Sequence, residues 1–138
     1  MSSIKPKFLI VDDDSSNRIV LKKMLEHIAL IDLASSGSEA VDFFSKAINE
    51  KTKYDVIFLD IMMPEMNGQE VLTQIRNLEK SNYIIPGEGA KVIIITGLDN
   101  ETAAFESHVL GCEAYLMKPF SRTQVQEKLL ELGFWTDK

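Results

Sequence analysis

Residues 54–68 read YDVIFLDIMMPEMNG, and the rest of the chain is organised around this stretch. Its apolar run VIFL favours a buried β-strand over a helix. The run ends abruptly in Asp60, and Pro64 and the pair Asn67 and Gly68 then stop any regular element. The sequence therefore predicts that Asp60 lies at the carboxyl end of a buried strand. In an open parallel sheet, this edge is where ligands bind.

The totals describe one soluble globular domain. The chain has 138 residues, of which 45% are hydrophobic and 26% charged. Its formal net charge of -6 argues against direct DNA binding, because nucleic-acid-binding domains usually carry a basic face. The acidic excess is either a solvated surface or a cluster of carboxylates that needs a cation. We expect a single domain over residues 1–138, with a core at about 7–132 and no output domain.

The single cysteine and the lack of long apolar runs predict a cytoplasmic protein. Cys112 cannot form an internal disulfide, and no CxxC or Cys/His metal pattern is present, so we interpret it as a small packing residue. No apolar run approaches the roughly 20 residues that span a bilayer. The N-terminal sequence MSSIKPKF has no hydrophobic signal region.

Short apolar runs alternate with amphipathic segments along the whole chain. Besides the central stretch, we expect strands at residues 8–11, Leu30–Ala34, 92–95 and Ala114–Met117. Each is followed by a predicted helix, and such alternation implies a parallel sheet with helices on both faces. Right-handed crossovers then give an α/β, doubly wound, five-stranded sheet of order 2-1-3-4-5, the flavodoxin-like (βα)5 architecture.

The helical segments have predicted caps and buried faces. Either Asp14 or Ser15 caps the first helix, which should bury Ile19, Val20, Met24, Leu25 and Ile28 and expose Arg18, Lys22, Lys23 and Glu26. A fourth helix should run from Asn100 or Thr102 to Leu110. Ser121 should cap the last one, with Val125, Leu129, Leu130 and Leu132 inward. Trp135 either covers that helix or is exposed.

Residues 81–91, SNYIIPGEGAK, form a loop that is long for an alternating domain. It is either a flexible insertion or a loop specific to a partner, and the sequence does not decide between them.

Polar residues follow four of the predicted strands. Asp12 and Asp13, Asp60, Thr96 and Lys118 should meet at one edge of the sheet. Alone, each has an ordinary interpretation, such as a helix cap or a solvated lysine, but none of these explains why all follow core strands. Three close carboxylates repel one another unless a hard divalent cation such as Mg²⁺ lies among them. No glycine-rich nucleotide loop is present. The set therefore indicates a site where a carboxylate accepts a phosphoryl group, with metal and lysine neutralising charge.

Four segments resemble a known family. FLIVDDD, FLDIMMPEMNG, IIITG and EAYLMKPF are similar, in order and spacing, to the receiver domains of two-component response regulators, in particular stand-alone ones such as the chemotaxis response regulator. The resemblance covers the chain from about residue 7 to 132. It implies that Asp60 is phosphorylated, by transfer from a histidine kinase or a histidine phosphotransfer protein. It also implies that Lys118 and Pro119 are joined by a cis peptide bond.

The resemblance assigns roles to the remaining site residues. Asp12, Asp13, Asp60 and the backbone carbonyl of Met62 would bind Mg²⁺. Thr96 and Lys118 would contact the phosphoryl group. Tyr115 occupies the position of the family's switch aromatic, although a half-buried structural tyrosine fits the sequence equally well.

These roles imply a phosphoprotein in a phosphorelay rather than an enzyme. The module would catalyse only its own phosphorylation and a slow self-dephosphorylation, because Met62 and Leu98 are apolar and cannot hold the attacking water. Gly97 stands where the family commonly has alanine or serine, which leaves more room over the phosphate. Phosphorylation would switch the face formed by the fourth helix, the strand Ala114–Met117 and the last helix. A separate effector protein would then bind there, without membrane contact. We expect a monomer, and dimerisation on phosphorylation stays open.

Two other classes remain as alternatives. A Mg²⁺-dependent phosphatase with Asp60 as nucleophile usually needs a second carboxylate two residues on, where this chain has Met62. A flavin-binding module needs a hydroxyl- and glycine-rich first loop, and the three aspartates at 12–14 would repel its phosphate.

Overall fold

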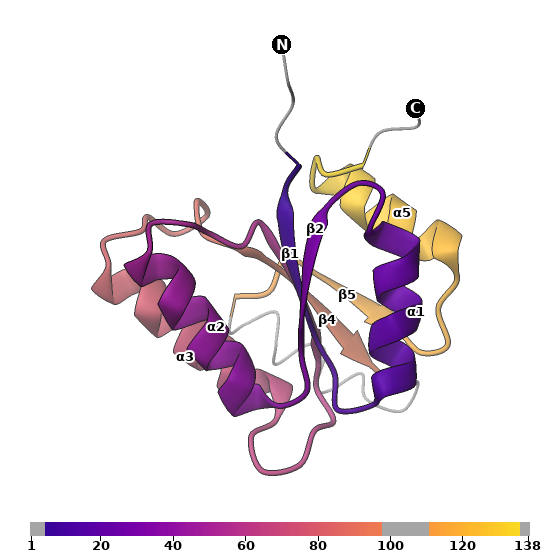
Figure 1. The fold of residues 1–138 in the computed structure, drawn as a ribbon, viewed down its shortest axis with the longest axis horizontal. Helices are drawn as coiled ribbons and strands as arrows, with labels where there is room; N and C mark the ends of the chain where they lie inside the picture. The colour runs from indigo at the N-terminus through magenta and orange to yellow at the C-terminus, as the bar shows by residue number, and fades with distance from the viewer. Residues whose placement is uncertain (1–4, 98–110, 136–138) are drawn as a thin grey trace.

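A single parallel sheet forms the centre of the molecule. The computed structural model describes residues 5–97 and 111–135 of the chain. Within them, five strands pair in parallel in the order β2-β1-β3-β4-β5, which confirms the predicted topology (Figure 1). The strands are β1 (Lys7–Val11), β2 (Leu30–Ala34), β3 (Val56–Asp60), β4 (Lys91–Thr96) and β5 (Ala114–Met117).

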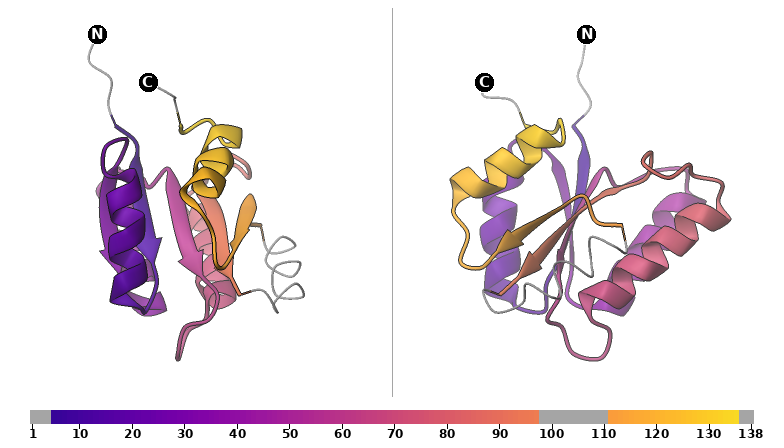
Figure 2. Two further views of the ribbon diagram at one scale, coloured as in Figure 1. Left: turned by 90° about the vertical axis from the view of Figure 1, so that its right-hand side faces the viewer. Right: turned by 180° about the vertical axis from the view of Figure 1, so that it is seen from behind.

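Helices cover both faces of this sheet. The described helices are α1 (Ser15–Leu25), α2 (Gly37–Asn49), α3 (Gly68–Ser81) and α5 (Arg122–Glu131). Figures 1 and 2 show α2 and α3 together on one face and α1 and α5 on the other. The predicted fourth helix, ending at Leu110, lies outside the described residues.

The alternation of side chains along the strands divides the core into two layers. Leu9 and Ile57 belong to the layer under α2 and α3, whereas Phe8 and Phe58 belong to the layer under α1 and α5. All five residues of β3 are buried. A strand buried on both faces is typical of the middle of a doubly wound sheet, and it explains the unbroken apolar run before Asp60.

Each described helix begins with a capping side chain just after a strand-end loop. Of the two candidates for α1, Asp14 is the N-cap, and its carboxylate accepts a hydrogen bond from the Ser16 N–H at 2.8 Å. Ser36 caps α2, while Asn67 and Ser121 form reciprocal capping boxes on α3 and α5. These caps fix the turns in which the polar residues at the carboxyl edge lie.

The predicted buried faces of two helices were partly wrong. In α1 the buried residues are Leu21 and Leu25, while Ile19 and Val20 are each 49% exposed. In α5 the buried residues are Val125 and Leu129, and Leu130 is 57% exposed because it follows Leu129 by about 100° of helical rotation. In both helices, two residues four apart make the stripe that meets the sheet.

The C-terminal end of the described chain folds back on the core. Trp135 is buried, and its ring packs edge-on against His27 at a centroid distance of 5.5 Å. Of the two options for Trp135, the buried one therefore holds. Cys112 is also buried, as expected of a packing residue. None of the described helices has the length and apolarity needed to cross a lipid bilayer.

Candidate functional site

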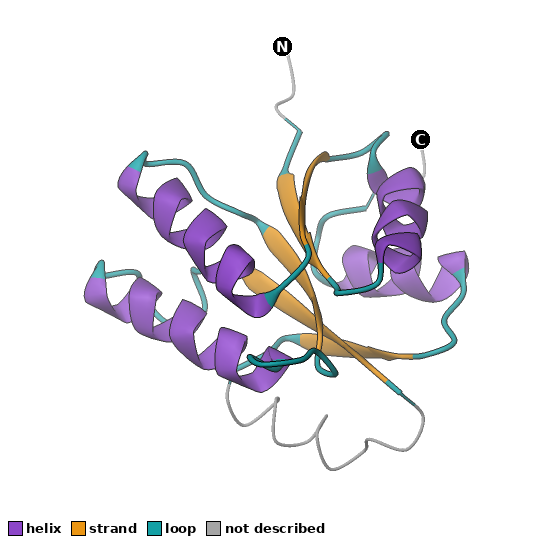
Figure 3. Ribbon diagram, turned by 60° about the horizontal axis from the view of Figure 1, so that its bottom comes forward, coloured by secondary structure: helices purple, strands orange, loops and turns teal. Residues whose placement is uncertain are grey.

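The carboxyl ends of the strands bring the predicted polar residues to one edge of the sheet. Figure 3 turns this edge forward. Asp12 follows β1 directly, Asp60 is the last residue of β3 and Thr96 the last of β4. The register pairs Asp60 with Ile95 and Thr96 with Met117, so that Lys118 follows β5 beside them. The convergence expected from the sequence is therefore present.

Three carboxylates form the centre of the site. Asp12, Asp13 and Asp60 each offer one oxygen, and these oxygens all lie within 4.8 Å of one another. Asp12 and Asp60 are 1% and 2% exposed, whereas Asp13 is open to solvent. The site is thus sealed by protein on one side and accessible on the other.

The buried carboxylates are only partly satisfied by hydrogen bonds. Asp12 Oδ1 accepts the Asp14 N–H at 2.9 Å, and Asp60 Oδ1 accepts the Met62 N–H at 3.0 Å. Among the described residues, no donor lies within hydrogen-bond distance of Asp12 Oδ2, although this atom is buried. A buried oxygen without a donor is costly unless a cation faces it.

Lys118 supplies the positive charge at this edge. Its Nζ lies 3.3 Å from Asp60 Oδ2 and 3.9 Å from Asp12 Oδ2. The backbone N–H of Lys118 donates to the Thr96 carbonyl at 2.7 Å. The peptide bond between Lys118 and Pro119 is cis, as expected. One ammonium group cannot neutralise three carboxylates, so the site keeps an excess of negative charge.

The excess charge and the burial act on the acidity of Asp60. Burial is the largest cause that raises the pKa of Asp60, and the nearby Asp12 carboxylate adds to it, while the Met62 N–H and Lys118 lower it; together these effects bring the pKa to about 6. The oxygen-only ligands, and the buried Asp12 Oδ2 that accepts no hydrogen bond within the described residues, fit a hard divalent cation such as Mg²⁺. Such a cation would offset both the burial of the Asp60 charge and its repulsion by Asp12.

The loop after β3 is held close to Asp60 by a glycine. The Gly68 N–H donates to the Ile61 carbonyl at 3.1 Å. A β-carbon at Gly68 would lie only 2.5 Å from the Asp60 carbonyl oxygen, so a larger residue does not fit. Within this loop the Met62 side chain is 63% exposed and Met63 is buried. These two methionines of the loop therefore lie on opposite sides, one at the surface and one in the core.

Thr96 and Tyr115 lie on the neighbouring strands. Thr96 is 1% exposed, and the contact recorded for its hydroxyl is a long one of 3.4 Å to the Gly97 carbonyl. That weak bond leaves the hydroxyl able to donate to another acceptor. Tyr115 is 46% exposed on β5, as a half-buried tyrosine would be. Leu98 lies outside the described residues.

One contributor to the site was missed by the sequence interpretation. Arg18 was expected on the solvent side of α1, but its Nη1 donates to the Asp12 carbonyl at 2.6 Å. This bond ties the first turns of α1 to the loop that carries Asp12 and Asp13. An arginine shortly after a run of aspartates is a weak signal, since the same pattern occurs on solvated helices.

Comparison with known proteins gives a consistent result. The family model of the response regulator receiver domain matches residues 8–130. The chain is 32% identical over 126 residues to the probable transcriptional regulator ycf27 of Guillardia theta, covering 91% of this chain and 44% of the relative. It is 33% identical over 120 residues to the transcriptional regulatory protein SrrA of Staphylococcus aureus (strain COL), covering 86% and 44%. It thus spans less than half the length of these curated relatives.

Solved structures share the fold. The chemotaxis protein CheY4 of Vibrio cholerae superimposes with a TM-score of 0.76 at 27% identity, covering 93% of this chain and 98% of that one. A chain from the CheX–CheY–BeF3–Mg complex of Borrelia burgdorferi gives a TM-score of 0.79 at 27% identity, covering 94% and 90%.

Proposed function

The chain belongs to the response regulator receiver domain family, and on this premise we propose that Asp60 is its phosphorylated residue. The observation that carries the proposal is the position of the Asp60 carboxylate between a lysine ammonium at 3.3 Å and two further aspartates. A carboxylate in this setting can act as a nucleophile toward phosphorus, and its surroundings can neutralise the charge that then builds up.

The transfer can be written from the groups at this edge. A carboxylate oxygen of Asp60 attacks the phosphorus of a phosphohistidine on a histidine kinase or a phosphotransfer protein. An oxygen–phosphorus bond forms as the nitrogen–phosphorus bond breaks, and the imidazole leaves with the electron pair and takes up a proton. Lys118 lies beside Asp60 Oδ2 and would pair with an oxygen of the incoming phosphoryl group.

Asp12, Asp13 and Asp60, together with the Met62 backbone carbonyl, would hold Mg²⁺. When bound, the ion supplies positive charge that offsets the carboxylates and the phosphoryl oxygens. The lack of a hydrogen bond to the buried Asp12 Oδ2 among the described residues supports this role. The Met62 carbonyl is carried over from the family, and its N–H already donates to Asp60 in the structure.

Phosphorylation would act on the rest of the molecule through Thr96 and Tyr115. The new dianion would attract the Thr96 hydroxyl, whose present bond is weak. Tyr115 would then change its exposure on β5, and the population of the switched state would rise. The surface affected includes β5, α5 and the predicted fourth helix. We propose that a separate effector protein binds there.

Loss of the phosphoryl group should be slow. Met62, two residues after Asp60, has an exposed thioether side chain, and a thioether cannot orient an attacking water well. The predicted partner in this effect, Leu98, is likewise apolar. Self-dephosphorylation with a lifetime of seconds would contradict this reasoning.

The test is labelling with a small phosphodonor. Incubation with acetyl phosphate and Mg²⁺ should add one phosphoryl group, detected by intact-mass spectrometry. The group should be absent when Mg²⁺ is chelated and absent in Asp60→Asn. Labelling of Asp60→Asn to the same extent, or no labelling of the wild-type protein with any small donor or histidine phosphotransfer protein, would refute the proposal.

A further inference from the structure

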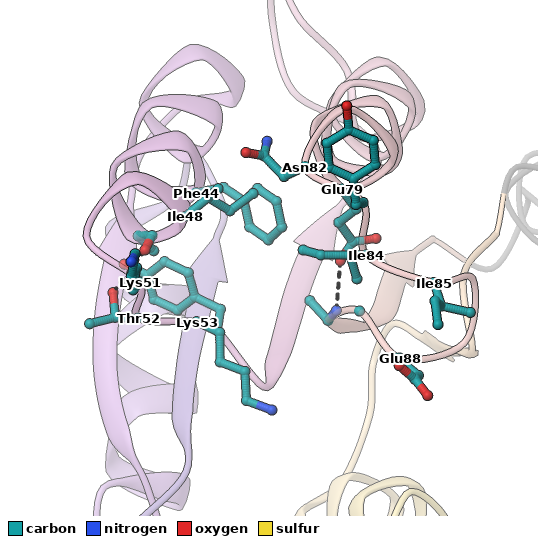
Figure 4. A pocket seen from close by; sticks show the side chains of 15 residues that line it. Phe44, Ile48, Lys51, Thr52, Lys53, Glu79, Asn82, Ile84, Ile85 and Glu88 are labelled. Carbon is teal, nitrogen blue, oxygen red and sulfur yellow. Dashed lines mark hydrogen bonds between the residues drawn. The ribbon is translucent and has the colours of Figure 1, made fainter.

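A groove opens at the amino end of the sheet, at the opposite end of the strands from Asp60. It lies between the C-terminal ends of α2 and α3 and the loop 81–91 (Figure 4), and it has a volume of about 520 Å³. Phe44, Ile48, Ile84 and Ala90 give it an apolar lining. This size and lining are typical of a surface that receives apolar side chains.

The two sides of the groove differ in charge and in exposed apolar side chains. The α2 side carries Lys51 and Lys53. The loop side carries Tyr83 and Ile85, which are 94% and 61% exposed, together with Glu88. No partner is recorded for the Lys51 or Glu88 side chain among the described residues. Lys53 has only a solvent-exposed contact of 3.7 Å with Asp55.

Two residues at the groove adopt a backbone conformation that favours glycine. Lys51 and Tyr83 have φ angles of 59° and 62°. Each stands just after a helix, where the next N–H closes the helix end: Thr52 donates to Ala47 and Ile84 to Glu79. Glycine would fit both positions with less strain. In place of glycine, the chain has the long basic Lys51 on one side of the groove and the large aromatic Tyr83 on the other.

The loop that presents Tyr83 and Ile85 is held in place by side chains of α3. The Glu79 carboxylate is buried, accepts the Ala90 N–H at 2.7 Å and occupies the space where a Gly89 side chain would lie. Arg76 in turn uses all five of its donors, on Glu79, Ala90, Glu113 and twice on the Gly111 carbonyl. The exposed apolar residues are therefore held ready for a partner, which lowers the entropy lost on binding.

We propose that this groove is an interface between two copies of the chain. A two-fold axis running along the groove lays the loop side of each copy on the α2 side of the other. Glu88 of one copy then faces Lys51 and Lys53 of its mate, and Tyr83 and Ile85 pack toward the other copy's apolar lining. The two sides of the groove are thus complementary in charge, as an isologous contact requires.

The interface is independent of the proposed phosphorylation site. Asp60 lies at the carboxyl end of β3, whereas the groove is formed around residues that precede β3 and β4. The dimer should therefore form in the unphosphorylated protein and in Asp60→Asn alike. A dimer that appears only on phosphorylation would use another face and would contradict this proposal.

Sedimentation equilibrium on the full chain tests the proposal. The wild-type protein should show a monomer–dimer equilibrium with a dissociation constant tighter than about 1 mM. Tyr83→Gly removes the aromatic side chain and relieves the strain, so it should keep or raise the thermal stability and yet weaken the dimer about tenfold or more. The control Leu130→Ala, which shortens another exposed apolar residue, this one on α5, should leave the dimer unchanged.

Charge exchange gives the sharpest comparison. Lys53→Glu and Glu88→Lys should each weaken the dimer by like-charge repulsion across the interface, and the double exchange should restore it. A wild-type protein that stays monomeric up to about 1 mM overturns the proposal. So does a dimer that Leu130→Ala weakens more than Tyr83→Gly, or a double exchange that fails to restore association.

Discussion

Replacing Asp60 with asparagine should stabilise the folded protein when metal is absent. Asparagine has nearly the same shape, and its Oδ1 can still accept the Met62 N–H. What the substitution removes is a buried negative charge close to Asp12. We therefore expect Asp60→Asn to unfold at higher urea concentration than the wild-type protein in buffer containing a chelator.

The magnitude follows from the acidity of Asp60. Burial, with the Asp12 charge, raises the pKa of Asp60 from 3.8 to about 6. A difference of roughly two pKa units corresponds to about 3 kcal/mol of cost to the folded state at neutral pH. The buried asparagine amide lacks a full set of hydrogen-bond partners, and this destabilises the variant by about 1 kcal/mol. A net stabilisation of about 2 kcal/mol is expected.

The pH dependence has a definite sign. Because the folded state binds the Asp60 proton more tightly than the unfolded state does, the cost is absent below pH 3.8, grows up to about pH 6 and is constant above it. Near pH 3.5 only the penalty of the asparagine amide is left, so the variant should be about 1 kcal/mol less stable than the wild-type protein, whereas at pH 7.5 it should be about 2 kcal/mol more stable. The buried Trp135, the single tryptophan, provides the fluorescence signal for urea unfolding.

Magnesium should reverse the order. Mg²⁺ stabilises a folded state that binds it, and Asp60→Asn lacks one of the three carboxylates. The exposed Asp42 on α2 provides a matched control, since Asp42→Asn should change neither the stability without metal nor the response to Mg²⁺. Lower stability of Asp60→Asn in chelator across pH 4 to 8, or equal stabilisation of both proteins by Mg²⁺, would refute the reasoning.

Three further substitutions test other contacts. Lys118→Met should slow labelling by acetyl phosphate at least tenfold while Mg²⁺ still stabilises the protein against urea, and unchanged labelling would exclude the role given to its ammonium group. Gly68→Ala should destabilise the fold by about 3 kcal/mol in urea unfolding, because its β-carbon meets the Asp60 backbone, and a change below 1 kcal/mol would contradict this. Arg76→Ala should cost about 3 kcal/mol by leaving the buried Glu79 carboxylate without its cation, and Arg76→Ala combined with Glu79→Gln should recover part of that loss.

The strands and the site edge could be predicted because their signals are local. Each strand is a short apolar run, and each is followed at once by a polar residue or a turn. Asp60 needed no distant information to be placed at a strand end. Once the alternation gave the strand order, the convergence of Asp12, Thr96 and Lys118 followed from topology, as the register confirms.

The helix faces depended on contacts that the sequence does not contain. In α1, Ile19 and Val20 form as regular a stripe with Met24 as Leu21 forms with Leu25, and only the position of the sheet selects the second. Arg18 was misplaced for the same reason. Its partner is the backbone of Asp12, and side chain to backbone contacts leave no trace in apolar periodicity.

The two ends of the sheet show which buried charges indicate a site. At the amino end, Arg76, Glu79 and Glu113 come from segments up to 37 residues apart, yet every donor of Arg76 is used and both oxygens of Glu79 are bonded. At the carboxyl end, Asp12 keeps one buried oxygen without a donor. A satisfied network stabilises the fold by itself, whereas a buried oxygen without a hydrogen bond destabilises it, and a bound cation would offset that cost. Because both ends contain buried charged residues, burial of charge alone does not distinguish them. What differs is whether each buried acceptor has a hydrogen-bond donor, and this favours the Asp60 edge as the place where the protein binds a cation.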